Sequence, residues 1–144
     1  VMGNAGAVSR KRSSMFTLDE FQQETAQLAQ VMYEGTGFGP KDVDIFNPYD
    51  GYLTFPQAYL EAFEWHGVKQ GEAHDFYAGD ITVEGPHPFM SSGGNNGTGR
   101  NRATHYLDCI EQLRGTAGQR QVTVKADVGA AGYGDWTMFS KHPD

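Results

Sequence analysis

The sequence predicts an α/β fold in which helices pack on the faces of a mixed β-sheet. Three observations point to this class. Helical and strand-like patterns alternate along the chain, the last two predicted strands are close enough to form a hairpin, and 144 residues are the length of one domain. Hydrophobic residues make up 38% of the chain, which is enough for a core. We therefore expect one domain over residues 1–144, with an antiparallel edge on its sheet.

The N-terminal region begins with small, apolar residues and continues into a helix. Residues 1–8 are typical of a strand end or a buried loop, and residues 9–14 form a basic connector. Thr17 followed by Glu20 three residues later is a capping box, which predicts the start of a helix. Apolar residues then recur at helical spacing, and Gly35 is the predicted end.

A short strand and a second helix follow. Residues 42–46 alternate between polar and apolar side chains, as a strand does, and Pro48 is expected to end it. Pro56 fits the first turn of the next helix, which we expect to end at Gly67. This order places residues 49–52 just beyond the carboxyl end of the strand.

The middle of the chain is less regular. Residues 68–92 carry several glycines and prolines and predict turns with one short helix or strand. Residues 91–99 are a glycine-rich loop, and a third helix is predicted over 103–114, capped by Gly115.

The C-terminal region predicts a hairpin. Residues 121–128 alternate with period two and are the clearest strand pattern in the chain. Residues 129–134 are expected to be a flexible turn, and residues 136–140 a second strand.

Composition excludes several classes of function. Eleven basic and eighteen acidic residues leave a formal charge of −7, which disfavours nucleic-acid binding. The single cysteine, Cys109, excludes an internal disulfide or a multi-cysteine metal site, and we expect a buried, inert thiol. No segment is long and apolar enough to predict a membrane span, and no signal peptide is evident, so we expect a cytoplasmic protein. Because the sequence starts at Val1, we expect it to be a fragment, a processed chain or a domain of a longer protein.

The glycine-rich loop is the first candidate site. Glycines let backbone amides approach a ligand, and the loop leads into a helix N-terminus, which favours anions. It departs from a nucleotide-binding P-loop because Arg100 and Asn101 stand where lysine and serine or threonine belong. A tight loop with a purely structural role remains the alternative. The five histidines show no metal-ligand spacing, and each alone is more typical of a surface or capping residue.

The order of motifs resembles the C-terminal half of the thiolase superfamily, in particular the sterol-carrier-protein and lipid-transfer branch with its steroid side-chain aldolase-like relatives. Three stretches carry the resemblance: Tyr49-Asp50-Gly51-Tyr52 after a strand, Gly93-Gly94 followed after four residues by Gly99-Arg100, and residues 111–122, which are the most specific. The likeness spans about residues 25–140. It implies that the N-terminal half of the thiolase fold is absent from this chain.

The resemblance also implies a site for coenzyme A thioesters. In the family the strand-end motif lines the acyl-CoA site, which assigns catalytic positions to Tyr49, Asp50 and Tyr52. The glycines of the loop and one helix residue would contact substrate or coenzyme A: Gly93, Gly94, Gly97, Gly99 and Tyr106. Two departures matter. Arg100 occupies the place of the usual histidine, and residues 126–129, the stretch matched to the second catalytic cysteine, contain none.

These departures favour a lyase over ordinary acyl transfer. Claisen chemistry needs a thiolate and a base. We therefore expect retro-aldol cleavage of a β-hydroxyacyl-CoA, with a steroid or lipid side chain as a possible acyl group. Tyr49 would be the acid–base group, with Tyr52 and Tyr106 as reserves. Arg100 would lower the pKa of the tyrosine or bind the enolate oxygen.

Other readings stay open. Both motif tyrosines can be core or wall residues. The chain can be a non-catalytic binding or assembly subunit, or an ordinary acetyl-CoA acyltransferase (thiolase). We expect coenzyme A thioester as a substrate and no permanently bound cofactor or metal. The expected partners are an N-terminal thiolase half or homologous subunit, within a dimer or other oligomer, and a small protein with an OB-fold and a zinc ribbon.

Overall fold

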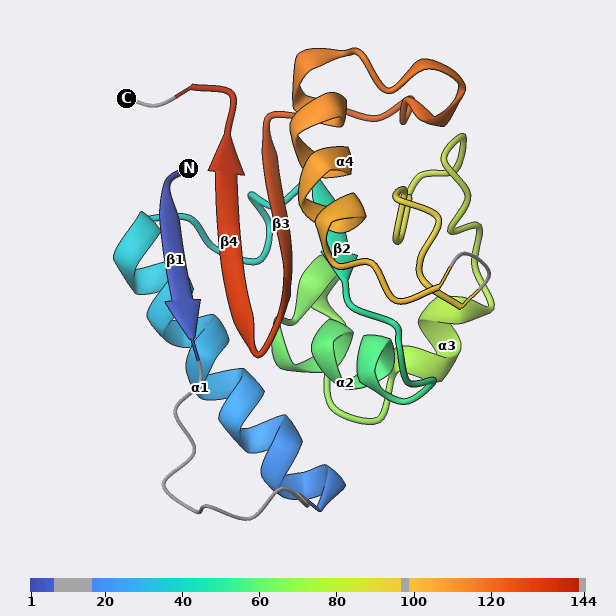
Figure 1. Cartoon of the computed structure of the whole chain (residues 1–144). Helices are drawn as coiled ribbons and strands as arrows, with labels where there is room; N and C mark the ends of the chain where they lie inside the picture. The colour runs from blue at the N-terminus through green and yellow to red at the C-terminus, as the bar shows by residue number, and fades with distance from the viewer. Residues whose placement is uncertain (7–16, 97–98, 143–144) are drawn as a thin grey trace.

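The computed structural model describes residues 1–6, 17–96 and 99–142 and contains a four-stranded mixed sheet with helices on both faces (Figure 1). The predicted α/β class is confirmed. The strand order is β1-β4-β3-β2; β2 and β3 are parallel, and the other pairs are antiparallel. The elements are β1 (Gly3–Gly6), α1 (Leu18–Thr36), β2 (Ile45–Pro48), α2 (Phe55–Ala62), α3 (Ala73–Tyr77), α4 (Ala103–Arg114), β3 (Val128–Tyr133) and β4 (Asp135–Ser140).

The predicted capping box starts α1. The Thr17 side chain accepts from the Glu20 N–H at 3.2 Å, and the Glu20 carboxylate accepts from the Thr17 N–H at 3.2 Å. The helix passes through the predicted end at Gly35 and stops before Gly37, whose φ of 75° closes the last turn. The basic connector predicted over residues 9–14 lies outside the described residues.

The strand β2 and the helix α2 lie near their predicted positions, with shifted ends. The strand begins at Ile45 because Asp44 turns its carboxylate to the N–H groups of Asp127 and Val128, at 2.8 and 3.0 Å. Pro48 is tolerated at its end because β2 is an edge strand. Pro56 lies in the first turn of α2, as predicted. Gly67 ends a separate 3₁₀ turn and not α2 itself.

The predicted strand over residues 121–128 is wrong. Only Val128 belongs to a strand, and the predicted turn over 129–134 is instead most of β3. The alternating residues are held by other groups: the Val122 N–H donates to the Gln112 side-chain oxygen at 3.0 Å. Small residues form β3 because α4 packs closely on it. A Cβ at Gly129 would lie 3.2 Å from the Cys109 Cβ. The predicted hairpin with residues 136–140 is confirmed, but it is formed by β3 and β4.

The predicted third helix is confirmed as α4, and Gly115 caps it with a φ of 70°. Within 68–92, the short helix is α3. Among the described residues, no helix is both long and apolar enough to cross a membrane.

The sheet divides the core into two parts. The helices α1 and α2 cover one face, and α4 covers the other, along β2 and β3 (Figure 1). Because side chains alternate along a strand, Phe46 joins the larger cluster with α1 and α2, whereas Ile45 packs with Cys109 and Leu113 of α4. Asn47 follows the same alternation and faces α4.

Candidate active site

Two tyrosines lie side by side at the carboxyl ends of the parallel strands. The register pairs Ile45 with Gly129 and Asn47 with Ala131, and these residues face α4. Two residues further along each strand stand Tyr49 and Tyr133, and at this strand end the Tyr133 ring packs against the larger core cluster. The Tyr49 N–H continues the ladder by donating to the Gly132 carbonyl at 3.0 Å, and the two ring centroids are 4.6 Å apart. This edge is where open α/β sheets place ligands.

Arg102 lies over both rings. It is the N-cap residue of α4, and its guanidinium carbon is 4.6 Å from the centroid of Tyr133 and 5.8 Å from that of Tyr49. The helix begins at this edge of the sheet because a crossover between parallel strands must return the chain past their carboxyl ends. The positive end of the α4 dipole therefore adds to the arginine charge.

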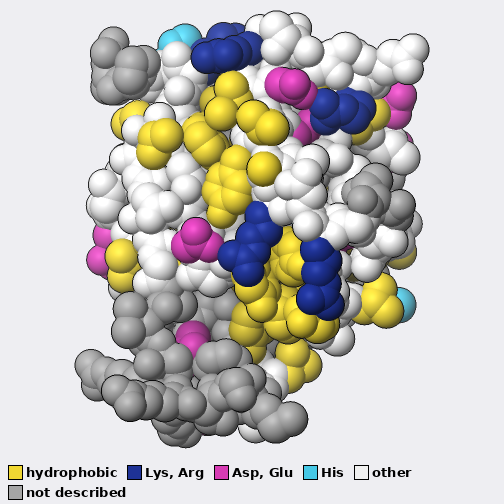
Figure 2. Space-filling model, in the orientation of Figure 1, with side chains coloured by type: hydrophobic (Ala, Val, Ile, Leu, Met, Phe, Trp, Pro, Cys, Tyr) yellow, Lys and Arg dark blue, Asp and Glu magenta, His cyan; other side chains and the backbone are white. Residues whose placement is uncertain are grey.

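Arg100, the arginine predicted for the site, contacts a different tyrosine. Its guanidinium carbon is 5.5 Å from the ring centroid of Tyr52, whose side chain is 47% exposed. Tyr52 packs on Phe55, which in turn stacks on Tyr133 with centroids 5.7 Å apart. The result is one aromatic surface carrying two arginines. Figure 2 shows basic side chains bordering a hydrophobic patch in the lower half of this face.

Asp50 holds the glycine-rich loop. Its carboxylate is 5% exposed and accepts from the Asn95 N–H at 2.6 Å, the Asn95 side-chain amide at 3.0 Å and the Asn96 N–H at 3.3 Å. Gly94 passes so close that a Cβ there would lie 2.4 Å from the carboxylate. The contacts explain why an acid follows Tyr49: it fixes the loop beside the tyrosine pair.

His105 is buried and neutral, contrary to the expectation of a surface or capping histidine. Its Nδ1 is 2.8 Å from the Ser92 hydroxyl, and its Nε2 is 2.5 Å from the Asn95 amide nitrogen. The Asn95 side-chain oxygen accepts from the Asn101 N–H at 2.8 Å, so its amide nitrogen faces His105 as a donor. Nε2 must therefore accept, and the ring proton lies on Nδ1. Burial lowers the pKa of His105, against the opposing charges of Asp50 and Asp108.

The tautomer of His105 decides whether the ring can act as a base for Ser92. A serine hydroxyl against a histidine, with a carboxylate 3.9 Å from the other ring nitrogen, has the outline of a nucleophile and its base. However, Nδ1 donates to Ser92, so it cannot take the serine proton. The Ser92, His105 and Asn95 chain is therefore a structural connection from the loop to α4.

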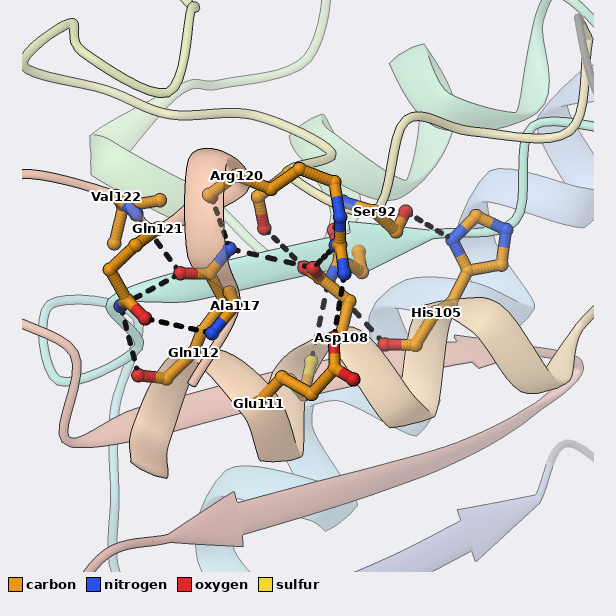
Figure 3. A network of polar contacts seen from close by, with 12 residues as sticks. Ser92, His105, Asp108, Glu111, Gln112, Ala117, Arg120, Gln121 and Val122 are labelled. Carbon is orange, nitrogen blue, oxygen red and sulfur yellow. Dashed lines mark hydrogen bonds and ion pairs between the residues drawn. The ribbon is translucent and has the colours of Figure 1, made fainter. Parts of the chain in front are cut away.

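A second polar network ties the far part of α4 to the loop and to the 3₁₀ turn Gly118–Arg120 (Figure 3). At its centre is Asp108, which is 1% exposed. Its carboxylate accepts from Ser91 at 2.5 Å, from Asn47 at 3.0 Å and from the guanidinium of Arg120. Arg120 also binds Glu111 at 2.6 Å. We call this cluster of Asn47, Ser91, Asp108, Glu111, Gln112 and Arg120 the clasp.

Comparisons with known proteins identify the family. Residues 6–141 match the model for thiolase C-terminal domain-like proteins. The chain belongs to this family. It is 37% identical over 100 residues to sterol carrier protein 2 of Rattus norvegicus, an alignment that covers 67% of this chain and 18% of that protein.

A solved structure, of an Ltp2-ChsH2(DUF35) aldolase, shares the fold. It matches with a TM-score of 0.70 and 20% identity over 96% of this chain and 38% of that chain. The thiolase-like chain thus spans a minor part of both proteins, and the predicted resemblance to this branch is confirmed.

The structure explains what the most specific family motif does. The stretch over 111–122 contributes Glu111, Gln112 and Arg120 to the clasp. The Gln112 amide donates to the Arg120 carbonyl at 2.6 Å, and its oxygen accepts from Gln121 and Val122, both at 3.0 Å. None of these contacts reaches the tyrosine pair. In this thiolase-like chain, the motif that predicts the family is structural.

The remaining predicted residues lie in the loop and on α4. Gly93 and Gly99 are exposed loop residues with positive φ, whereas Gly97 lies outside the described residues. Tyr106 faces β4, where its hydroxyl donates to the Asp135 carbonyl at 3.3 Å, and burial raises its pKa. Cys109 is fully buried and burial raises its pKa, which confirms the inert thiol.

Tyr133, Arg102 and His105 were not predicted as site residues. The stretch matched to the second catalytic cysteine of the family was residues 126–129, but in the structure the turn between β3 and β4 is at Tyr133 and Gly134. Tyr133 therefore lies four residues beyond the stretch that was searched for a cysteine. The sequence signal available for it was an isolated aromatic residue between glycines in a stretch of small residues.

Proposed function

We propose that this chain forms part of an acyl-CoA carbon–carbon lyase and that the Tyr49–Tyr133 pair performs its acid–base chemistry. The observation that carries the proposal is the approach of the two rings to 4.6 Å at the carboxyl edge of the parallel strands. The shared fold with a chain named an aldolase supports it. The name of the sterol carrier protein relative favours a steroid or other lipid acyl group.

The reaction proposed is a retro-aldol cleavage. Tyr49, in its phenolate form, takes the proton of the β-hydroxyl group of a β-hydroxyacyl-CoA. The oxygen electrons form the carbonyl of a ketone or aldehyde, and the Cα–Cβ bond breaks. Its electron pair moves into the thioester as an enolate, to which Tyr133 gives a proton at Cα. A proton then returns from Tyr49 to Tyr133, so the pair ends as it began.

Ordinary thiolase chemistry is disfavoured for this chain. It requires a thiolate nucleophile, and Cys109, the single cysteine in the sequence, has a raised pKa because it is buried. His105 cannot serve as its base, because both ring nitrogens are engaged by Ser92 and Asn95. A tyrosine base needs neither group.

Coenzyme A thioester is proposed as a substrate, with no permanently bound cofactor. The glycine-rich loop, with Gly93, Gly94, Gly97 and Gly99, would approach it, and Tyr52 with Arg100 would form the exposed rim of the site. Asp50 is proposed to position the loop, because its oxygens accept N–H groups of Asn95 and Asn96.

A partner domain or subunit is part of the proposal. The chain spans 38% of the solved aldolase chain. Leu107 on α4 is 57% exposed, and a cavity of about 330 Å³ is lined in part by Ile110 and Phe139. Figure 2 shows hydrophobic side chains in the upper part of this face, where α4 lies beside β4. We propose that a homologous thiolase half covers this surface and that an OB-fold protein with a zinc ribbon is a further partner.

The test measures release of a ketone or aldehyde and of the shortened acyl-CoA from a β-hydroxyacyl-CoA. The protein is purified together with the polypeptides that remain bound to it. Tyr49→Phe and Tyr133→Phe should each lower the rate by about 100- to 10,000-fold, the usual contribution of a general acid or base. Tyr33→Phe is the matched control, because the Tyr33 ring packs on Phe63 and its hydroxyl donates to the Phe63 carbonyl at 2.8 Å, within the core between α1 and α2.

The outcomes separate the candidate functions. Cleavage that survives both site substitutions removes the tyrosines from the mechanism. Binding of coenzyme A esters with no cleavage by the wild type would favour the non-catalytic assembly subunit.

A further inference from the structure

Arg102 differs from Arg120, the arginine of the clasp, in the partners of its guanidinium N–H groups. Arg120 binds both Asp108 and Glu111 through its guanidinium. The Arg102 guanidinium makes no hydrogen bond or ion pair with any residue that the structure describes; it lies over the faces of Tyr49 and Tyr133. A guanidinium presents five N–H donors in a planar fork that matches an oxyanion. Those donors are free to bind a ligand.

The neighbouring tyrosine points to the same place. Tyr49 is 5% exposed, yet its hydroxyl makes no hydrogen bond to any residue in the described part of the chain. Its hydroxyl lies against the backbone of Gly51, where a Cβ would be 2.3 Å away. The Tyr49 oxygen is not among the fully buried polar atoms that lack a partner, so it still reaches the surface of the molecule. Two groups without a protein partner, one cationic and one phenolic, therefore mark a site for an oxygen-bearing ligand.

We propose that Arg102 is the catalytic residue that binds the thioester oxygen of the substrate while negative charge develops on it. The inference rests on the proposed retro-aldol reaction and adds the group that this reaction needs. When the Cα–Cβ bond breaks, its electron pair moves through Cα to the thioester oxygen. Donors fixed where charge develops lower the barrier, and the positive end of α4 acts in the same direction.

Arg100 provides the matched comparison. It belongs to the same loop and has the same charge, but its guanidinium lies over Tyr52 at the exposed rim. If the arginines acted only by long-range attraction of an anionic ligand, replacing either one would weaken binding of that ligand to the same extent. Direct binding of the enolate oxygen requires Arg102 alone, because only Arg102 lies over the tyrosine pair.

The experiment compares two ligands by isothermal titration. S-carboxymethyl-coenzyme A carries a carboxylate near the position of the enolate oxygen, and coenzyme A itself does not. R102Q should weaken binding of the carboxymethyl compound by about 10- to 100-fold, the value of a hydrogen bond to a charged group, and leave coenzyme A binding unchanged. R100Q should leave the ratio of the two affinities as in the wild type, and R102K should restore part of the loss.

The results that would overturn the inference are specific. Equal affinity of wild type and R102Q for the carboxymethyl compound would do so, as would an equal loss in R100Q or a wild type that does not bind it. In cleavage assays, R102Q should lower kcat with little change in KM. A wild type that binds the analogue through Arg102 but cleaves no β-hydroxyacyl-CoA would refute the proposed function while leaving the oxyanion site in place.

Discussion

The arginines near the two ends of α4 differ in whether they pair with acidic residues. At its C-terminal end, the clasp joins Arg120 to Asp108 and Glu111, and each charge has a partner. At its N-terminal end, Arg102 has aromatic faces beneath it and no anion among the described residues. The motif most specific to the family therefore maintains the scaffold. The groups without partners among the described residues are the ones that remain open to a ligand.

The largest expected effect is a loss of cleavage activity on substitution at the N-terminal end of α4, where the tyrosine pair lies. Tyr133→Phe should lower turnover by about 100-fold or more, because it removes a proton donor. Thermal stability should remain within about 0.5 kcal/mol of wild type, because the Tyr133 hydroxyl makes no hydrogen bond to a described residue. Steady-state kinetics and calorimetry together measure this. A large loss of stability would place Tyr133 with the scaffold instead.

The clasp should show the reverse pattern. Asp108→Ala leaves Arg120, Asn47 and Ser91 without their shared acceptor, so we expect a loss of about 3–5 kcal/mol in the free energy of unfolding. Urea denaturation measures the change. Glu111→Ala is the control: it removes the more exposed partner of Arg120 and should cost less than about 1 kcal/mol. If both substitutions cost the same, Asp108 is not the centre of the clasp.

The loop between the two ends allows a paired glycine test. Gly93→Ala and Gly94→Ala both place a side chain at positive φ, which costs about 1–2 kcal/mol. A methyl group at Gly93 meets open space, whereas one at Gly94 collides with the Asp50 carboxylate. We therefore expect Gly94→Ala to lower the free energy of unfolding by about 1 kcal/mol more than Gly93→Ala does. Equal unfolding midpoints would show that Asp50 does not anchor the loop.

The smallest effect concerns pH. Burial lowers the pKa of His105 below its usual 6.5, so the unfolded chain binds a proton that the folded chain does not. Stability should therefore fall as the pH drops below about 6.5, the pKa of histidine in the unfolded chain. Burial also lowers the pKa of His66, so that residue contributes with the same sign.

The readout is the difference between wild type and His105→Gln at each pH. The variant should show a shallower decline in stability with acidification. Identical slopes for the two proteins would mean that His105 is protonated as readily in the folded chain as in the unfolded one.

Much of the local structure was predictable because its causes are local. Thr17 and Glu20 cap α1 through backbone groups three residues apart, and Gly115 ends α4 through its own conformation. The strand over 121–128 failed for the opposite reason. Its alternation fits a strand, but the Gln112 side chain and neighbouring loops take its hydrogen-bonding groups.

Residue order and short-range chemistry were enough to predict the family and the α/β class. Only the tertiary structure decided that Tyr133 joins Tyr49 and that Arg102 rather than Arg100 lies over them. Parallel pairing of β2 and β3 brings together residues 84 positions apart, and the return of α4 sets which arginine covers them. Such distances between side chains depend on strand register and helix packing, which no local pattern contains.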